Sequence, residues 1–276
     1  MRMYALSLFA FGVLTPPAGA QAPPVDPVPV LAAARAALGG DAKLSAVKTF
    51  IATGRTRQVQ GDNLVPIEFE ISCELPDRCI RRDEIPARES GPTTIGFTGD
   101  TLIQIPVPPA PPAGLGGPAP SPLPPGGAAP TPGRGGPPPQ LAALRVNTTK
   151  QDFARLWLGM FAASFPSFPL TFTHAGRAEA PQGLADVLEA KGPANFTARL
   201  FVLQDTHLPI MLSWQGQAQG KPVENRIYYA DYREVDGMKF PFRLRRAVGA
   251  DTVEETTFDR FRVNARIDAR KFEVRR

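Results

Sequence analysis

The sequence is poor in the side chains that most enzymes use for acid–base and metal chemistry. It contains two histidines and two cysteines in 276 residues. His174 lies in a predicted strand and His207 in a predicted turn, and neither has a partner at a spacing typical of a metal site. Isolated histidines of this kind are typical of structural hydrogen bonding, and two cysteines alone cannot form a structural zinc site. We therefore expect no metal and no cofactor.

The motifs of common hydrolases and nucleotide-binding folds are missing as well. The chain has no G-x-S-x-G elbow, no H-E-x-x-H helix, no P-loop and no G-x-G-x-x-G that follows a strand. Asp231, Glu234 and Asp236 cluster in sequence, but they alternate with aromatic and basic residues, as in a solvated turn. Our hypothesis is that the chain is not an enzyme. A hydrolase would require acids or histidines from distant segments to converge.

The charge of the chain is modest and evenly spread. The formal net charge is +5, from 31 lysines and arginines against 26 aspartates and glutamates. Such an excess is a weak indication of an anionic partner such as lipid headgroups, and surface solubility is the better explanation. The basic residues are not concentrated as they are in nucleic-acid-binding proteins, so we expect no nucleic-acid partner.

A long apolar run is present at the N-terminus. Residues 4–14 are almost entirely apolar, follow Arg2 and precede small residues that end at Ala20 or Ala22. This is the layout of a secretory signal peptide, and the run is too short to span a bilayer; a buried core helix is the alternative. We predict a signal peptide at 1–22 with no lipid-modified cysteine after it. The mature chain, 23–276, is then a soluble exported protein of the periplasm without a transmembrane segment.

The two cysteines lie close together in the sequence. Cys73 and Cys79 flank a turn at Pro76-Asp77, which predicts that they stand near each other on adjoining strands. In an oxidising compartment we expect them to form a disulfide. Two buried free thiols are the alternative, because a bridge requires Cα atoms less than about 7 Å apart.

Alternating apolar and polar residues predict an antiparallel sheet. In 67–75, Ile67, Phe69 and Ile71 share one face, the pattern of a half-buried strand. Asp236-Gly237 predicts a tight hairpin, since Gly accepts a positive φ. Pro241 in the returning strand indicates an edge or strand-entry position, because it has no N–H to donate. Further strands are predicted at 50–59, 78–85, 93–97, 101–105, 169–180, 185–191, 195–204, 209–216, 227–232, 240–244 and 252–263.

Helical patterns occur in two parts of the chain. Asp26-Pro27 predicts the N-cap and first turn of a helix that ends at Gly39-Gly40, with a short helical turn at 41–47 after it. A capping-box pattern at 149–152 predicts the start of a second helix. Its apolar stripe is typical of a core contact, and it would also line any cavity beneath it. The stripe consists of Phe153, Leu156, Trp157, Met160 and Phe161.

Residues 106–139 differ in composition from the rest of the chain. They consist almost entirely of Pro, Gly and Ala, with few large apolar side chains. Such a segment cannot bury enough apolar surface to offset the entropy of ordering, so we predict a disordered insertion within one domain at 23–276. Docking of the segment to an aromatic groove of a partner is the alternative.

Several segments resemble exported bacterial proteins of the LolA/LolB-like superfamily, described as outer-membrane lipoprotein-sorting-like. The matching segments are 205–209 (DTHLP), 229–241 (YADYREVDGMKFP), 264–268 (NARID) with Phe272, and Leu38-Gly39-Gly40 followed by a strand with Gly54. The resemblance implies an α+β fold: a curved antiparallel half-barrel sheet with helices covering the concave face, around an apolar cavity. The lipoprotein carrier of this superfamily holds acyl chains there. Its ligand-contacting arginine matches no position here, so the lipoprotein role is not carried over.

The function predicted from these features is that of a soluble periplasmic binding or carrier protein. It would shelter a hydrophobic ligand, such as a lipid or a lipoprotein acyl chain, in the half-barrel cavity. The alternative is a non-enzymatic interaction or sensor module, in which side chains fill the cavity and outer-membrane or periplasmic proteins are the partners. The candidate cavity-lining residues, chosen for their size and inward parity, are Phe69, Ile71, Trp157, Phe161, Phe201, Met211 and Trp214.

Overall fold

The structure is a computed structural model and describes residues 26–61, 63–86, 89, 91–106 and 139–273. The predicted signal peptide at 1–22 and almost all of the predicted insertion at 106–139 lie outside the described residues. Among the described residues, no helix is long and apolar enough to cross a membrane.

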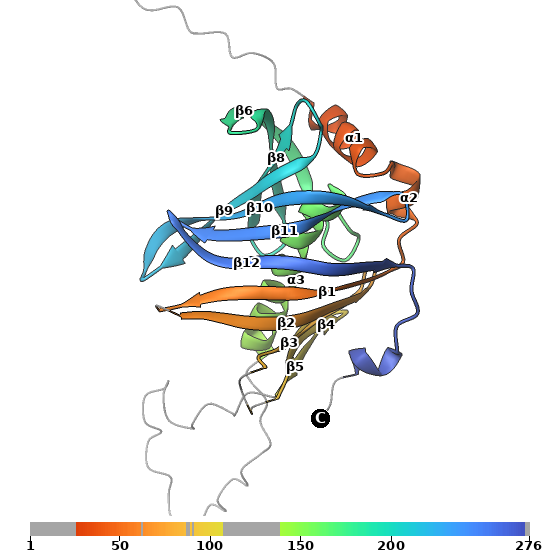
Figure 1. Cartoon of the computed structure of the whole chain (residues 1–276), viewed down its shortest axis with the longest axis vertical. Coiled ribbons are helices and arrows are strands. Elements are labelled where there is room, and N and C mark those ends of the chain that lie inside the picture. Colours follow the sequence, from red (N-terminus) through yellow and green to blue (C-terminus); the bar gives the residue numbers. More distant parts are fainter. Residues whose placement is uncertain (1–25, 62, 87–88, 90, 107–138, 274–276) are drawn as a thin grey trace, which may run out of the picture.

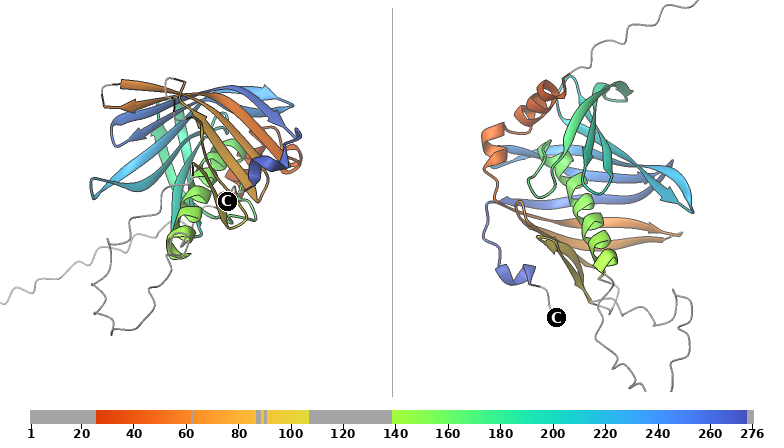
Figure 2. Two further views of the ribbon diagram at one scale, coloured as in Figure 1. Left: turned by 90° about the horizontal axis from the view of Figure 1, so that it is seen from below. Right: turned by 180° about the vertical axis from the view of Figure 1, so that it is seen from behind.

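Twelve antiparallel strands form a single sheet in the order β5-β4-β3-β2-β1-β12-β11-β10-β9-β8-β7-β6. The sheet is strongly curved and open, and it wraps around one long helix, α3 (Figures 1 and 2). The predicted α+β half-barrel is therefore confirmed. The strands are β1 Thr49–Gln60, β2 Asn63–Glu74, β3 Arg78–Glu84, β4 Thr93–Thr98, β5 Thr101–Ile105, β6 Thr171–Ala180, β7 Gly183–Gly192, β8 Phe196–Leu203, β9 Pro209–Ala218, β10 Lys221–Val235, β11 Met238–Val248 and β12 Asp251–Val263.

Helix α3 (Pro139–Phe161) crosses the concave face, whereas α1 (Pro27–Ala37) and α2 (Asp41–Ser45) lie at one end of the half-barrel (Figure 2). The predicted helical cover of the concave face is therefore provided by α3. A 3-10 helix, η1 (Ala269–Phe272), follows the last strand. Helix α1 begins as predicted, because the side chain of Asp26 accepts a hydrogen bond from the backbone N–H of Val28 at 2.9 Å.

The predicted start of α3 at the capping box was wrong. The helix begins at Pro139, and Thr149 lies inside it, where its hydroxyl donates to the carbonyl of Arg145 at 3.0 Å. Asp152 pairs with Arg155 in the same helix at 2.8 Å. The stretch from 141 to 145 is rich in leucine and alanine, which have high helix propensity, and this explains the earlier start.

The hairpin between β10 and β11 forms as predicted. Val235 pairs with Met238, and the two turn residues have positive φ, 54° at Asp236 and 74° at Gly237. Of the two positions predicted for Pro241, the edge strand was wrong, since β11 lies between β10 and β12, whereas Pro241 does precede the ladder to β12. The ladder between β11 and β12 begins at Arg243, so the missing N–H of Pro241 breaks no bond to β12.

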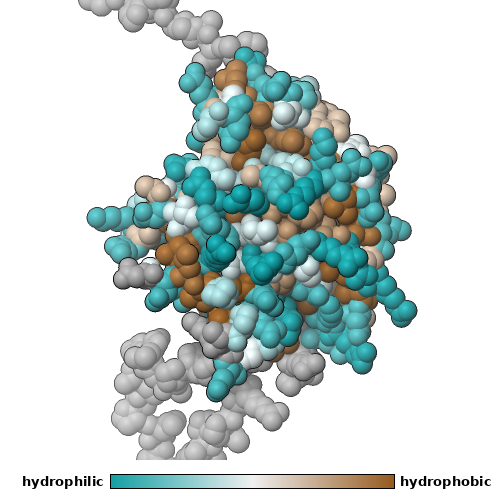
Figure 3. Space-filling model, viewed as in Figure 1, coloured by the Kyte–Doolittle hydropathy of each residue, from teal (hydrophilic) through white to brown (hydrophobic). Residues whose placement is uncertain are grey.

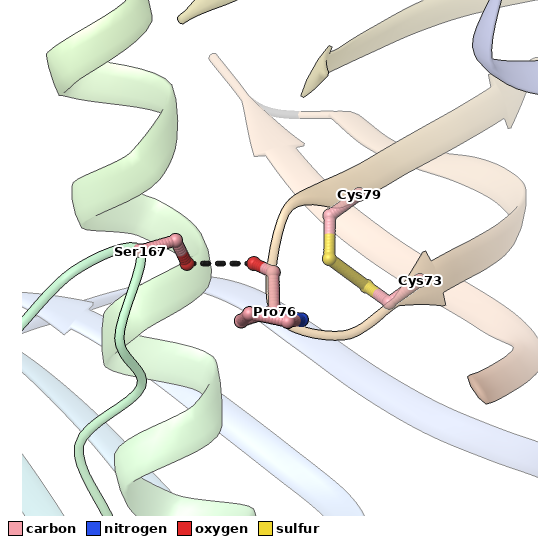
Figure 4. The surroundings of a disulfide bond; sticks show 4 residues. All are labelled: Cys73, Pro76, Cys79 and Ser167. Carbon is pink, nitrogen blue, oxygen red and sulfur yellow. Dashed lines mark hydrogen bonds between the residues drawn. A yellow bond between two sulfur atoms is a disulfide. The ribbon is translucent and has the colours of Figure 1, made fainter. Parts of the chain in front are cut away.

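The predicted disulfide is present. Cys73 and Cys79 stand directly opposite each other on β2 and β3, with Cα atoms 4.1 Å apart, and are bonded (Figure 4). Both are fully buried. The turn between them contacts the loop that follows α3, since the hydroxyl of Ser167 donates to the carbonyl of Pro76 at 2.6 Å. The bridge and this hydrogen bond hold β2 and β3 beside the end of α3.

Segments that carry the resemblance meet at the end of the half-barrel near α1. The N–H of Lys239 donates to the carbonyl of Leu38 at 2.8 Å. A Cβ on Gly39, which has φ +130°, would lie 2.6 Å from the carbonyl oxygen of Gly237, so only glycine fits there. The side chain of Asn264 accepts from the N–H of Lys48 at 2.8 Å. These turns therefore join the segment from the end of α1 to the start of β1 to the last strands.

Two hydrophobic clusters lie on opposite faces of the sheet. The larger one fills the concave side around the C-terminal half of α3, where Phe50, Phe161, Phe240 and Phe261 form an aromatic group with ring centroids 4.9 to 6.0 Å apart. The smaller one lies on the other side of the sheet, beneath the segment that contains η1. It consists of Ile51, Ile80, Ile103, Ile267 and Phe272.

Candidate functional site

A cavity of about 380 Å³ lies between residues 149–156 of α3 and the concave surface of the sheet. Its apolar lining comes from several strands and from α3. The most buried members, each no more than 8 % exposed, are Ile67, Phe69, Ile71, Phe153 and Phe258. Five partly exposed residues complete the apolar lining: Ile95, Leu156, Trp214, Ile227 and Leu244.

The local patterns explain why these side chains converge. Ile67, Phe69 and Ile71 alternate along β2 and so share its inward face. On α3, Thr149, Asp152 and Leu156 are spaced by three and four residues, so they form one stripe that faces the cavity. The cavity is thus enclosed by one helix face and one sheet face.

Charged residues also line the cavity, in equal numbers of each sign. We call them the charged rim: Arg81, Asp83, Asp152, Arg155, Arg246 and Glu254. Arg81 pairs with Asp83 at 2.7 Å, and Arg155 with Asp152 at 2.8 Å. Arg246 stands directly opposite Glu254 in the ladder between β11 and β12. Most of the rim is more exposed than the apolar lining, which places it towards the solvent.

The side chain of Arg155 is 11 % exposed, less than those of Arg81 at 27 % and Asp152 at 69 %. Its guanidinium carbon lies 4.6 Å from the ring centroid of Trp214 and 5.3 Å from that of Phe196. Burial lowers the pKa of Arg155, and Asp152 opposes this effect. Because arginine keeps its proton in proteins, the side chain is a fixed cation held between two aromatic rings.

Asp152 has the opposite environment within the same ion pair. The surrounding cavity walls raise the pKa of its carboxyl group by desolvation, whereas Arg155 and Arg246 act to lower it. The side chain is nevertheless 69 % exposed, so water in the cavity weakens both effects. An exposed carboxylate paired with an arginine in this way is ionised at neutral pH.

Two tyrosines of β10 hold α3 against the sheet. The hydroxyl of Tyr229 donates to the carbonyl of Arg155 in α3 at 3.1 Å. The hydroxyl of Tyr232 lies between the carbonyl of Gly159 in α3, at 3.4 Å, and that of Pro209 in β9, at 2.7 Å. Burial raises the pKa of both tyrosines above their ordinary range. Their hydroxyls therefore stay protonated at any ordinary pH and position the helix that forms one wall of the cavity.

The structure brings three of the seven predicted lining residues together at the cavity: Phe69, Ile71 and Trp214. Trp157 and Phe161 are 1 % exposed and belong to the core. Trp157 packs against Phe165 with ring centroids 4.7 Å apart. These two side chains fill the part of the concave face next to the cavity.

The inward parity assigned to Phe201 and Met211 was wrong. They pair with each other across β8 and β9 on the face away from α3, where they line a second, open cavity of about 560 Å³. The neighbouring pair, Leu200 and Leu212, is fully buried beneath α3. Apolar residues occupy both faces of these strands, so alternation alone does not reveal which face is covered. The face away from α3 is mostly hydrophilic, with apolar patches between (Figure 3).

Sequence reasoning missed the charged rim. Arg155 and Asp152 lie beside the apolar stripe of α3, and Arg246 follows Leu244 on the inward side of β11. The sequence does contain a usable signal. A charged residue two positions from an apolar one on a strand, or three to four positions from one on a helix, shares a face with it and so can line the same cavity.

His174 makes structural hydrogen bonds. Its Nδ1 accepts from the N–H of Gly176 at 3.2 Å, and its Nε2 lies 3.0 Å from a carboxylate oxygen of Asp186. Both ring nitrogens are therefore already used within β6 and β7. Within the described ranges, no three or more His, Cys, Asp or Glu side chains are grouped so that they could hold a metal ion.

Comparison with known proteins bears on the fold. No protein-family model and no curated protein matches the chain. A LolA superfamily protein from Nitrosomonas europaea has 14 % sequence identity and a TM-score of 0.53, with 90 % of this chain and 98 % of that one covered.

Two further solved structures have TM-scores below 0.5. A DUF1329 family protein from Desulfovibrio piger has 10 % identity and a TM-score of 0.47, with 90 % and 98 % of the two chains covered. A putative outer membrane lipoprotein-sorting protein domain from Vibrio parahaemolyticus has 9 % identity and a TM-score of 0.46, with 81 % and 88 % covered. The first likeness, together with the open twelve-stranded sheet around α3, establishes that the chain has a LolA-like fold.

Proposed function

We propose that this chain is a periplasmic binding or carrier protein that shelters a hydrophobic ligand, such as a lipid or an acyl chain. The observation that carries the proposal is the cavity of about 380 Å³ between α3 and the concave face. Its volume is in the range of small-ligand sites, and its most buried lining is apolar. In this proposal residues 1–22 direct export, 23–276 form one domain with an insertion at 106–139, and the chain performs no catalysis.

The physical basis of binding would be burial of apolar area. Each buried methylene group contributes about 0.8 kcal/mol, which corresponds to about a fourfold gain in affinity. Association itself costs several kcal/mol, so a short chain binds weakly and a longer one tightly. The affinity for a series of ligands should therefore rise about fourfold per methylene until the cavity is filled.

One observation favours a second candidate, a non-enzymatic interaction or sensor module. Trp157 and Phe161 fill the concave face next to the cavity. If side chains also move into the remaining space in solution, the half-barrel would serve as a scaffold for a protein partner and would hold no ligand.

Two measurements separate these candidates. The mature protein is purified from its native host and analysed by native mass spectrometry for bound lipid, and it is then titrated with a fluorescent fatty acid. Leu156→Trp fills the cavity and should reduce fatty-acid uptake at least about tenfold. Phe201→Trp introduces the same side chain on the face away from α3 and should leave uptake unchanged. Absence of co-purifying lipid together with absence of uptake would refute the carrier.

A further inference from the structure

The balanced signs of the charged rim are informative about the head of the ligand. Three arginines and three carboxylates line a cavity whose most buried lining is apolar. We propose that the cavity selects single-chain amphiphiles with a zwitterionic head, one that carries a phosphate or carboxylate and an ammonium group together. This inference rests on the proposed binding function and concerns its ligand class.

Burial separates the innermost apolar lining from most of the charged rim, with Arg155, 11 % exposed, as the exception. Phe69, Ile71 and Phe258 are at most 5 % exposed and would contact a chain. Asp152 is 69 % exposed, and Arg81 and Asp83 are 27 % and 28 % exposed. A ligand that followed this gradient would place an apolar tail inside and a polar head at the rim. The volume lies at the lower end of the small-ligand range, which favours one chain over two.

The arrangement of charges disfavours a head of a single sign. An anionic head beside Arg246 would also approach Glu254, its cross-strand neighbour, and a cationic head beside Asp152 would approach Arg155. Because the formal charges of the rim sum to zero, the rim does not attract a net-charged ligand over distance. A head with both charges can contact an arginine and a carboxylate at once. Each rim group then replaces its oppositely charged neighbour in the rim with the oppositely charged group of the ligand.

The positions of the arginines and acids support such an exchange. Asp152 lies within the electrostatic influence of both Arg155 and Arg246. Arg155 is held by stacking on Trp214. Asp152 is free to turn towards an ammonium group because most of its side chain is exposed, and Arg246, also exposed, can meet an anionic group.

The test compares ligands with one chain length and different heads. Lysophosphatidylethanolamine, lysophosphatidylglycerol, a free fatty acid and an alkyltrimethylammonium salt compete with a fluorescent apolar probe for the purified protein at low ionic strength. We expect the zwitterionic lipid to bind at least about tenfold more tightly than the anionic and cationic ligands. Equal affinities, or tighter binding of a net-charged ligand, would overturn the inference and leave the carrier function intact; failure of every ligand to bind would overturn both.

Glu254 and Glu255, adjacent residues of β12, provide a test variant and its matched control, and Arg246 of β11 provides a test of the opposite sign. Glu254→Gln removes a rim carboxylate and should shift the preference about fivefold towards the anionic lipid. Arg246→Gln should shift it by a similar factor towards the cationic ligand. Glu255→Gln changes the net charge of the chain equally, but Glu255 lines the cavity on the other face and should shift nothing. A shift of equal size in Glu255→Gln would show that overall charge, and not the rim, sets the preference, and would contradict the inference.

Discussion

The contact between α3 and β10 at Gly159 allows a severe test of the architecture. A Cβ at this position would lie 2.1 Å from two ring atoms of Tyr229 and 2.6 Å from its hydroxyl oxygen. The tyrosine is 5 % exposed, and its hydroxyl donates to the carbonyl of Arg155, so the ring has little room to move. Gly159→Ala therefore has to displace the helix or the ring.

The expected magnitude follows from two opposing effects. Alanine in place of glycine inside a helix normally stabilises by up to about 1 kcal/mol. Overpacking costs about 1 to 3 kcal/mol, and loss of the tyrosine hydrogen bond adds about 1 kcal/mol. We expect a net loss of about 2 kcal/mol in the free energy of unfolding, which lowers the Tm by about 4 to 8 °C for a chain of this size.

Urea unfolding and thermal melting of the purified protein measure this effect. In the background of Tyr229→Ala the clash is absent, so Gly159→Ala should there be neutral or stabilising, and the two substitutions should be strongly non-additive. An unchanged or raised Tm for Gly159→Ala alone would refute the close contact between α3 and β10 and, with it, the position of the cavity wall.

Three further predictions concern other connections of the fold. Arg35→Ala should destabilise by about 1.5 to 3 kcal/mol in urea unfolding, because the side chain is 15 % exposed and donates to the last carbonyl of α3, that of Phe161, at 2.9 Å. Cys73→Ala/Cys79→Ala should cost about 2 kcal/mol of unfolding free energy, since the bridge closes a loop with a separation of 6 residues. Burial acts to raise the pKa of Glu70, but hydrogen bonds from Lys271 and Ser72 outweigh it and leave the pKa below its ordinary value of 4.5. The contact of Glu70 with Lys271 thus stabilises above about pH 4.5 and is lost as the pH falls through the lowered pKa, which hydrogen exchange of the C-terminal segment should reveal.

Each of these predictions has an internal control. Arg55→Ala removes an exposed ion pair and should change stability by less than about 1 kcal/mol. Reduction of the wild-type protein, which keeps both buried sulfur atoms, should lower the stability by about the same 2 kcal/mol; an unchanged stability would contradict the role of the bridge. Glu70→Gln should abolish the pH dependence of exchange at the C-terminal segment, and persistence of that dependence would assign it to another group.

The sheet was largely predictable from the sequence because its signals are local. Alternation along β2, the Asp236-Gly237 turn and the spacing of the cysteines each depend on neighbouring residues, and the structure confirms all three. The edge and strand-entry alternatives for Pro241 stayed open because the choice depends on where the ladder to β12 begins, which the residues of β11 do not encode. Local chemistry thus predicts elements better than their partners.

The candidate site was predictable only in part. Phe69 and Ile71 sit on a strand with one apolar face, so their orientation followed from parity. Phe201 and Met211 sit on strands that are apolar on both faces, and the covered face is decided by α3, which is distant in sequence. The charged rim was missed because each residue looks like ordinary surface until helix and strands bring the six together.

The pairing of β1 with β12 has a consequence for how the chain acquires its structure. β1 is among the first strands to be made and β12 is the last, yet they are neighbours in the middle of the sheet. Loop-closure entropy must be overcome before this pairing contributes stability, so the two halves join late and slowly. An N-terminal fragment that ends before β12 leaves β1 as an open edge, a surface prone to pair with other chains. The half-barrel therefore becomes one continuous sheet only when the final strand is available.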